Sequence, residues 1–121
     1  MKSIISSLIV LTLLVLLIPS TQAQQTPSKN ATCTFTVHGV CDQCKARIEK
    51  AAKIPGVKFA SWDKETQQLK VIYNSRKTDQ ASVEKAVAKV GHDTKSAKAD
   101  STTYRALPAC CSYREDHVHP H

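Results

Sequence analysis

The spacing of apolar residues between positions 32 and 97 constrains the fold of this chain more than any other feature. From Thr32 to His38 apolar and polar residues alternate, which is the period of a half-buried strand. Between Asp42 and Lys53 the apolar residues recur every three or four positions, as on one face of a helix. Pro55-Gly56 is expected to end this helix. The spacing therefore predicts a strand followed by an amphipathic helix.

The second half of this region repeats the change in period. Residues 57–62 are predicted as a second strand, residues 63–66 as a hairpin turn and residues 69–73 as a third strand. Thr78 or Asp79 can cap a second helix, and Gly91 closes it. The expected buried stripe of that helix consists of Val83, Ala86, Val87 and Val90. A short fourth strand is expected at residues 94–97.

The resulting order is strand, helix, strand, strand, helix, strand. This is the split βαβ arrangement, so we expect an α+β, ferredoxin-like sandwich with two helices on one face of a four-stranded antiparallel sheet. A core of this size is marginal when apolar burial is its only source of stability. Support from a metal ion or a disulfide would therefore matter.

The N-terminal residues have the composition of a secretory signal peptide. Met1-Lys2 gives a positive start, residues 8–18 are almost entirely apolar, and small residues precede Ala23. A permanent membrane anchor is the alternative, but the apolar run is shorter than the roughly 20 residues that span a bilayer. We therefore expect a signal peptide at 1–23, no stable membrane insertion after its cleavage, and a periplasmic or secreted protein. The remaining divisions are a linker at 24–31, a domain at 32–98 and a Cys/His-containing C-terminal tail at 99–121.

The net charge of +7 at pH 7 does not by itself indicate a nucleic-acid partner. The basic residues are dispersed along the sequence, and aromatic residues are few. An exported protein also rarely meets nucleic acid. A solvated basic surface is the interpretation that fits these observations.

The odd number of cysteines favours a metal-binding or reactive role over a purely structural set of disulfides. An odd number in an exported protein leaves at least one thiol unpaired or held by a metal. All five follow the expected signal peptide: Cys33, Cys41, Cys44, Cys110 and Cys111.

The segment Cys41-Asp42-Gln43-Cys44 is the main candidate site. It follows a turn at Gly39 and opens the first predicted helix, where backbone N–H groups and the helix dipole favour thiolate over thiol. Lys45 and Arg47 add positive charge nearby. Two thiolates suit a soft ion such as Cu(I) or Hg(II) with few ligands, and an ion held in this way can pass to another protein's thiols by ligand exchange.

Several motifs resemble the heavy-metal-associated domain family, which includes copper chaperones, N-terminal modules of metal-transporting ATPases and the periplasmic mercuric-ion scavenger. The resemblance extends from Phe35 to Ala97. It implies that Cys41 and Cys44 are the two metal-binding cysteines, and that His92 occupies the loop position beside them. The motifs are Val37-x-Gly39, Cys41-x-x-Cys44, Ile48-Glu49-Lys50-Ala51, Pro55-Gly56-Val57, Val71-x-Tyr73 and Val90-Gly91-His92.

The metal-binding loop departs from the pattern of this family. The usual loop reads Gly-Met-Thr/x-Cys, whereas this one reads Gly39-Val40-Cys41 and lacks the methionine that packs under the loop. We expect Val40 to take that packing role. The loop is also one residue shorter than the usual one, and this difference is expected to move Cys41 from its position in the family's two-coordinate site.

The other cysteines and histidines are secondary candidates. Cys33 shares a strand face with apolar residues and is expected in the core, whereas His38 points to the opposite, solvated face. For Cys110-Cys111 two interpretations stay open: one disulfide, or a tail that folds back and supplies a third or fourth thiolate, which would favour Zn(II), Cd(II) or a Cu(I) store. The tail histidines are weak candidates for borderline ions: His117, His119 and His121.

Three functions follow from these observations. The leading hypothesis is a non-enzymatic, exported carrier that scavenges a soft ion, with Cu(I) favoured over Hg(II) and Zn(II), and passes it to a metal transporter or efflux ATPase. The second is a metal sensor in which binding reorders residues 98–121. The third is a thiol–disulfide oxidoreductase, against which the strand order argues. A metal-bridged dimer is compatible with an exposed CxxC loop.

Overall fold

The computed structural model describes residues 29–114. The expected signal peptide, most of the linker and the three tail histidines His117, His119 and His121 lie outside the described residues. Within the described part, no helix has the length and apolar character needed to cross a membrane. The elements in chain order are β1 (Asn30–Thr36), α2 (Asp42–Ala52), β2 (Val57–Trp62), β3 (Gln68–Asn74), α3 (Gln80–Lys89), α4 (Ser101–Arg105) and a 3-10 turn, η1 (Ala109–Cys111).

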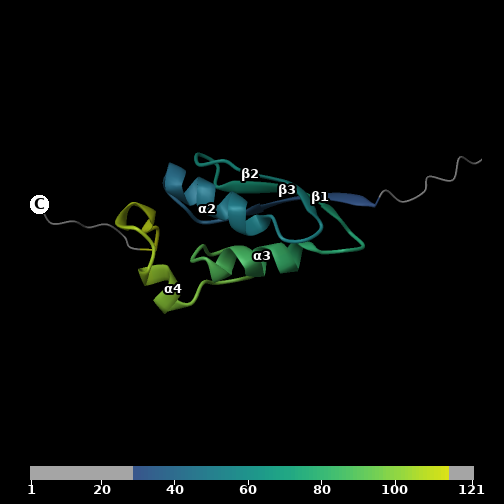
Figure 1. Cartoon of the computed structure of the whole chain (residues 1–121). Helices are drawn as coiled ribbons and strands as arrows, with labels where there is room; N and C mark the ends of the chain where they lie inside the picture. The colour runs from purple at the N-terminus through teal and green to yellow at the C-terminus, as the bar shows by residue number, and fades with distance from the viewer. Residues whose placement is uncertain (1–28, 115–121) are drawn as a thin grey trace, which may run out of the picture.

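The three strands form one antiparallel sheet in the order β1-β3-β2, so β3 is central. Leu69 on β3 lies opposite Phe35 on β1 and opposite Trp62 on β2. Because inward residues of all three strands share one cluster with residues of α2 and α3, both helices cover the same face of the sheet (Figure 1). The predicted α+β arrangement with two helices on one face is therefore confirmed.

The prediction of a fourth strand at residues 94–97 is wrong for the part of the chain that the structure describes. Thr94 forms only an isolated bridge to Val37, at the outer edge of β1. The Thr94 amide then donates to the carbonyl of Ala97 at 2.7 Å, and the Thr94 hydroxyl donates to the Glu84 carboxylate. These local hydrogen bonds bend the chain back within four residues, so no ladder extends along β1.

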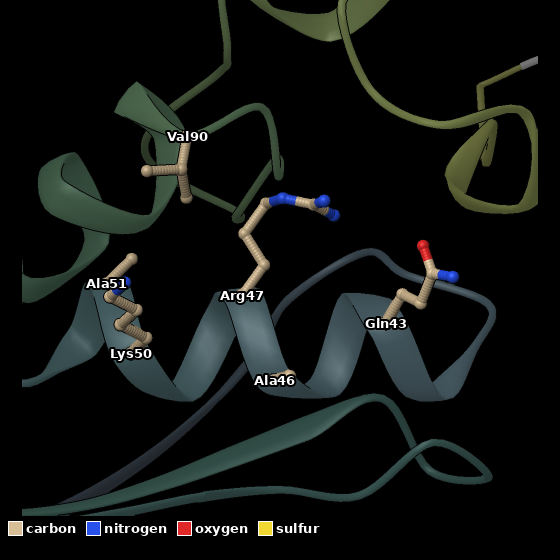
Figure 2. Close-up of a pocket in the computed structure, with 6 residues that line it drawn as sticks. All are labelled: Gln43, Ala46, Arg47, Lys50, Ala51 and Val90. Atoms are coloured by element: carbon tan, nitrogen blue, oxygen red, sulfur yellow. The ribbon is translucent and has the colours of Figure 1, made fainter.

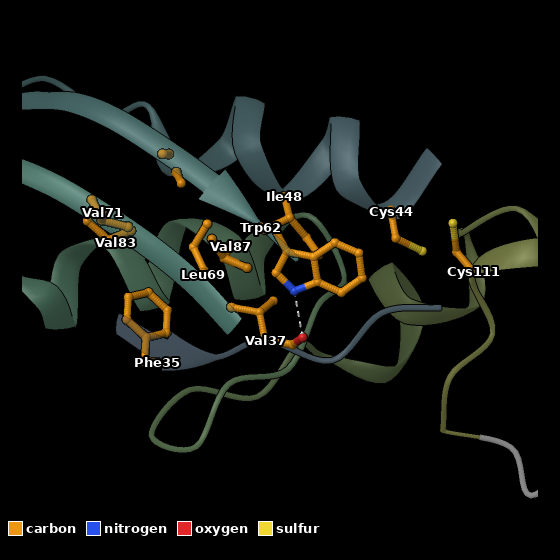
Figure 3. Packing of buried hydrophobic residues seen from close by; sticks show 12 residues of the cluster. Phe35, Val37, Cys44, Ile48, Trp62, Leu69, Val71, Val83, Val87 and Cys111 are labelled. Atoms are coloured by element: carbon orange, nitrogen blue, oxygen red, sulfur yellow. Dashed lines mark hydrogen bonds between the residues drawn. The ribbon is translucent and has the colours of Figure 1, made fainter. Parts of the chain in front are cut away.

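The core is built around side chains that the apolar periods predicted. Ile48 of α2 and Val87 of α3 are fully buried beside Leu69, and Trp62 lies among them with its indole N–H donating to the Val37 carbonyl at 3.0 Å (Figure 3). Cys44 belongs to the same cluster and lies at its edge. The core thus reaches directly to the CxxC loop.

The stripe on α3 differs in part from the prediction. Val83 and Val87 are buried, but Ala86 and Val90 are only half-buried. Glu84 is buried instead, because its carboxylate accepts hydrogen bonds from Gln80 and from residues of the bend that replaces the fourth strand. A charged side chain is tolerated there because it is fully hydrogen-bonded.

Residues 99–114, which we call the strap, pack against the end of the domain where α2 begins (Figure 1). The strap contains α4 and η1, and it buries Tyr104 and Cys111. It therefore docks at the CxxC loop.

Candidate metal centre

The loop that carries Cys41 approaches the core very closely. A Cβ atom on Gly39 would lie 3.0 Å from the Trp62 ring and 3.1 Å from the Cβ of Cys44. Such distances are tighter than most Cβ contacts, so a larger residue would force the Trp62 ring or Cys44 to give way. Gly39 therefore lets the loop bring Cys41 next to Cys44.

Cys41 is also the N-cap of α2. Its backbone is extended, with φ −142° and ψ 172°, and its sulfur accepts a hydrogen bond from the Cys44 amide at 3.4 Å. A sulfur at this position faces the unpaired N–H groups and the positive end of the helix dipole. The start of the helix therefore stabilises negative charge on Cys41.

Three cysteine sulfurs come together at this point. The Sγ of Cys41 lies 3.2 Å from that of Cys44 and 3.3 Å from that of Cys111, and all three sulfurs lie within 4.8 Å of one another. Cys44 and Cys111 are fully buried, whereas Cys41 is half-buried. The cluster joins two residues of the CxxC motif with one residue about 70 positions later in the chain.

The fourth cysteine of this region, Cys110, is exposed. Its sulfur lies 3.6 Å from that of Cys41 and 3.9 Å from that of Cys111, and it donates to the Gln43 side chain at 3.4 Å. All cysteines of the described residues are free. The tail thus folds back to the CxxC motif, as one of the two open interpretations of Cys110-Cys111 required, and no disulfide accompanies it.

The thiols of the cluster differ in acidity. Burial raises the pKa of Cys41, but its hydrogen bonds with the Cys44 thiol and amide, and with Cys111 and Cys110, outweigh this and lower the pKa to about 7. Burial together with the neighbouring sulfurs of Cys44 and Cys41 raises the pKa of Cys111. The pKa of Cys110 is raised by its contact with Cys41. Without an ion, negative charge is therefore concentrated on Cys41, because nearby sulfurs cannot all ionise together.

Of the two expected positive neighbours, only Arg47 contacts a sulfur. Its Nη1 donates to the Sγ of Cys111 at 3.3 Å. Lys45 instead binds the Glu49 carboxylate and the backbone carbonyl of Trp62, so its ammonium group makes no contact with the thiols. Both positive residues lie near the loop as expected, but Lys45 is paired with Glu49 whereas Arg47 contacts the cluster directly.

An open groove of about 700 Å³ runs along α2 beside the cluster (Figure 2). Gln43 and Arg47, which contact Cys110 and Cys111, also line this groove. The remaining lining residues are Ala46, Lys50, Ala51 and Val90. The side chains that hold the strap cysteines are therefore reachable from one side of the helix.

The secondary candidates lie apart from the three sulfurs. His92 is fully buried, its Nδ1 lies 2.8 Å from the His38 carbonyl, and its Nε2 has no hydrogen-bond partner among the described residues. Burial lowers the pKa of His92, which favours a neutral ring. Cys33 is half-buried opposite Val71 and packs against the core, as expected. None of these belongs to the group of ligand atoms within 4.8 Å, among residues 29–114.

Val40 does not take the packing role that the loop pattern suggested. Its side chain is 48% exposed. The space near the sulfurs is instead occupied by the Trp62 ring, which contacts the loop at Gly39, and by Cys111. In this shorter loop the supporting apolar contacts come from β2 and from the strap.

Three residues that hold the strap did not stand out in the sequence. The Tyr113 hydroxyl donates to the Gly91 carbonyl at 2.6 Å and accepts from the Asp93 amide at 2.8 Å, and Arg114 forms a bidentate ion pair with Asp93. The aromatic residues near the C-terminus were the available signal, but nothing in their spacing indicated a partner. Such contacts between distant segments have no periodic signature.

Comparison with known proteins relates most of the described domain to a family of metal-binding modules. The family described as the heavy-metal-associated domain matches residues 34–93. A copper-exporting P-type ATPase of Bacillus subtilis (strain 168) is 33% identical over 75 residues, which are 61% of this chain and 9% of the ATPase. The chain therefore spans only a small part of that relative.

Two solved structures share the fold at similar levels of identity. The CopZ metallochaperone superposes with a TM-score of 0.51 at 29% identity, covering 53% of this chain and 98% of CopZ. The N-terminal domain of a potential copper-translocating P-type ATPase from Bacillus subtilis, in its Cu(I)-loaded state, gives a TM-score of 0.52 at 31% identity, covering 55% of this chain and 85% of that domain. These matches cover little more than half of the chain.

Proposed function

We propose, since this chain belongs to the heavy-metal-associated domain family, that it captures one soft metal ion at Cys41 and Cys44 and passes the ion to a metal-transport protein. The observation that carries this proposal is the pair of sulfurs 3.2 Å apart where α2 begins. The family is one of metal-binding modules and not of enzymes. We therefore assign the CxxC motif to binding and not to redox catalysis.

The donor set favours a thiophilic ion. Thiolate sulfur selects Cu(I), Hg(II) and Zn(II) over hard cations such as Mg²⁺. Copper is the ion in the names of the ATPase relative and of the Cu(I)-loaded domain, so Cu(I) is the cargo that we favour. Hg(II) and Zn(II) are the alternatives that the same sulfurs would accept.

Transfer by ligand exchange needs no change in oxidation state. As a thiol of the receiving protein binds the ion it releases its proton, and the departing cysteine of this chain takes one up. The half-buried Cys41 and the exposed Cys110 lie on the accessible side of the cluster, where an incoming thiol would arrive. A transporter or an efflux ATPase is the class of partner that the similarity to the copper-exporting ATPase supports.

Export completes the proposal. The apolar run at residues 8–18 and the small residues before Ala23 support a cleaved signal peptide, which would place the carrier in the periplasm or outside the cell. N-terminal sequencing of the purified protein tests this step. A chain that starts at Gln24 is expected, and a chain that keeps residues 1–23 would contradict export by cleavage.

The experiment that tests the proposed function is a titration of the reduced protein with Cu(I) against a competing chelator. The wild type is expected to bind one ion tightly, and Cys41→Ser/Cys44→Ser to lose more than about 100-fold in affinity, beyond the usual effect of losing a supporting contact. Cys33→Ser is the matched control, because Cys33 packs against the core away from the cluster. Unchanged binding by the double variant would overturn the proposal.

A further inference from the structure

We propose that Cys111 is a third thiolate ligand of the bound ion, and that Tyr113 and Arg114 form a latch that holds it beside Cys41 and Cys44. This inference rests on the proposed function, because it assumes a soft metal ion at the two cysteines of the CxxC motif. The inference gives the proposed site three sulfur ligands in place of two, and it names the contacts that keep the third ligand in place.

The arrangement of the three sulfurs fits a three-coordinate ion. With metal–sulfur bonds of about 2.3 Å, three sulfurs around a trigonal ion lie about 4 Å apart, whereas two sulfurs on opposite sides of an ion lie about 4.6 Å apart. The observed triangle has sides of 3.2 and 3.3 Å, and its third side is under 4.8 Å. It needs to open by less than about 1 Å to hold a trigonal ion. A linear two-sulfur site would need a larger separation of Cys41 and Cys44.

The surroundings distinguish Cys111 from Cys110 as the third ligand. Cys111 is fully buried, and its side chain faces that of Cys44 (Figure 3). Cys110 is exposed, and its sulfur donates to the Gln43 side chain. The guanidinium of Arg47 contacts the Cys111 sulfur at 3.3 Å. Three thiolates around a monovalent ion leave net negative charge, and Arg47 is placed to offset it.

Tyr113 fixes the chain two residues after Cys111. Its hydroxyl bridges the Gly91 carbonyl and the Asp93 amide, so both of its hydrogen-bonding functions are used by one loop of the domain. Its ring stacks on His92 at 5.6 Å between centroids and on His38 at 6.0 Å. The buried His92 therefore serves as a platform for the strap.

Arg114 completes the latch through charge-assisted contacts. Its Nε and Nη2 donate to the two carboxylate oxygens of Asp93 at 2.8 and 2.6 Å. Its guanidinium also lies 4.5 Å from the centre of the Tyr104 ring, and its amide donates to the Tyr104 hydroxyl. Bidentate pairs of this kind fix orientation as well as position. The contacts of the latch with the domain are to His38 and to the loop Gly91–Asp93, so its loss would act on the position of Cys111.

The consequence is a site whose coordination depends on the strap. With the latch closed the ion has three sulfur ligands, and with the latch open it keeps the two of the CxxC motif. A lower coordination number leaves an ion more open to attack by thiols of another protein. The strap therefore sets how readily the ion is released.

The test measures sulfur coordination of the Cu(I)-loaded protein by X-ray absorption, together with the rate at which a chelator removes the ion. The wild type and Cys110→Ser are expected to show three sulfurs, and Cys111→Ser two. Arg114→Gln is expected to shift the average toward two sulfurs and to speed ion removal by about 10-fold, the lower range for loss of a supporting contact. Arg105→Gln is the matched control, because Arg105 is an exposed arginine on the same strap.

Each failure has a distinct signature. Two sulfurs in the wild type, or three in Cys111→Ser, would overturn the role of Cys111 while the proposed function stands. Equal effects of Arg114→Gln and Arg105→Gln on coordination and removal rate would overturn the latch. A Cys41→Ser/Cys44→Ser variant that still binds Cu(I) tightly would instead overturn the proposed function. Thermal unfolding of each metal-free variant separates these effects from misfolding.

Discussion

Residues 30–93 and the strap are held in place by different interactions. The domain is stabilised by apolar side chains that interlock between the sheet and two helices, with Leu69 and Trp62 at the centre. The strap buries few large apolar side chains, and its position depends on the hydrogen bonds and ring contacts of Tyr113 and Arg114. The free energy gained by burying apolar side chains is roughly proportional to the buried area and does not depend on direction. Hydrogen bonds and ion pairs, in contrast, require particular partners.

This difference means that the three clustered sulfurs are positioned in two ways. Cys41 and Cys44 are positioned by the start of a helix that the core holds rigidly. Cys111 is positioned by the strap, whose contacts with the domain are mainly hydrogen bonds and ring contacts. The cluster therefore combines two sulfurs placed by the apolar core and a helix start with one placed by polar contacts of the strap.

The largest expected effect is on the domain. Leu69→Ala should lower the free energy of unfolding by about 2–5 kcal/mol, because a fully buried side chain leaves a cavity between β1 and β2. Urea unfolding followed by circular dichroism measures it. Lys70→Ala, at the exposed neighbouring position, should change stability by no more than about 0.5 kcal/mol. Similar losses for both variants would contradict the assignment of the core.

A smaller effect is expected where the two regions meet. Gly39→Ala places a methyl group 3.0 Å from the Trp62 ring and 3.1 Å from Cys44, so the neighbouring groups must give by a few tenths of an ångström. We expect a loss of about 1–3 kcal/mol in the free energy of unfolding, together with weaker Cu(I) binding. Val40→Ala is the control, since Val40 is largely exposed. If the two variants unfold at the same urea concentration, the close approach at Gly39 is unimportant.

The strap should respond to acid. Burial raises the pKa of Asp93, but hydrogen bonds from Arg114 and from the Ala99 amide outweigh this and hold it below its ordinary value of 3.8. A depressed pKa means that the stabilisation is complete above 3.8 and is lost as the pH falls through the lower folded-state value. We expect Arg114→Gln to reduce this acid dependence by about 1 kcal/mol. Unfolding free energies measured from neutral to strongly acidic pH test this, and a wild-type slope that the variant retains in full would contradict it.

The smallest effect is expected for a polar contact on the surface of the domain. Lys64 and Asp42 form an ion pair at 3.1 Å, but their side chains are 48% and 86% exposed. Solvent screens such a pair, so Lys64→Ala should change the free energy of unfolding by less than about 0.5 kcal/mol. Urea unfolding of Lys64→Ala beside Arg114→Gln makes the comparison. If Lys64→Ala lowers the free energy of unfolding as much as Arg114→Gln does, the lower exposure of the Arg114–Asp93 pair does not make it the stronger of the two ion pairs.

Much of the domain was predictable because its signals are local. The second strand was predicted at residues 57–62 and begins and ends there, and Asp79 caps α3 by accepting from the Ser82 amide. The fourth strand was not predictable, because Glu84, on a helix ten residues earlier, captures Thr94 and bends the chain. The packing role expected for Val40 failed for a similar reason, since distant residues fill that space.

The sequence by itself determined the α+β class, the two amphipathic helices and the pair Cys41–Cys44, since apolar period, turn residues and a helix start act over a few neighbouring positions. Only the tertiary structure decided that Cys111 joins this pair, that Arg47 and not Lys45 faces the sulfurs, and that Tyr113 and Arg114 fasten the strap. Those contacts join residues up to 70 positions apart. Such contacts depend on shape and hydrogen-bonding geometry between distant segments, and shape and geometry of this kind leave no periodic pattern in the sequence.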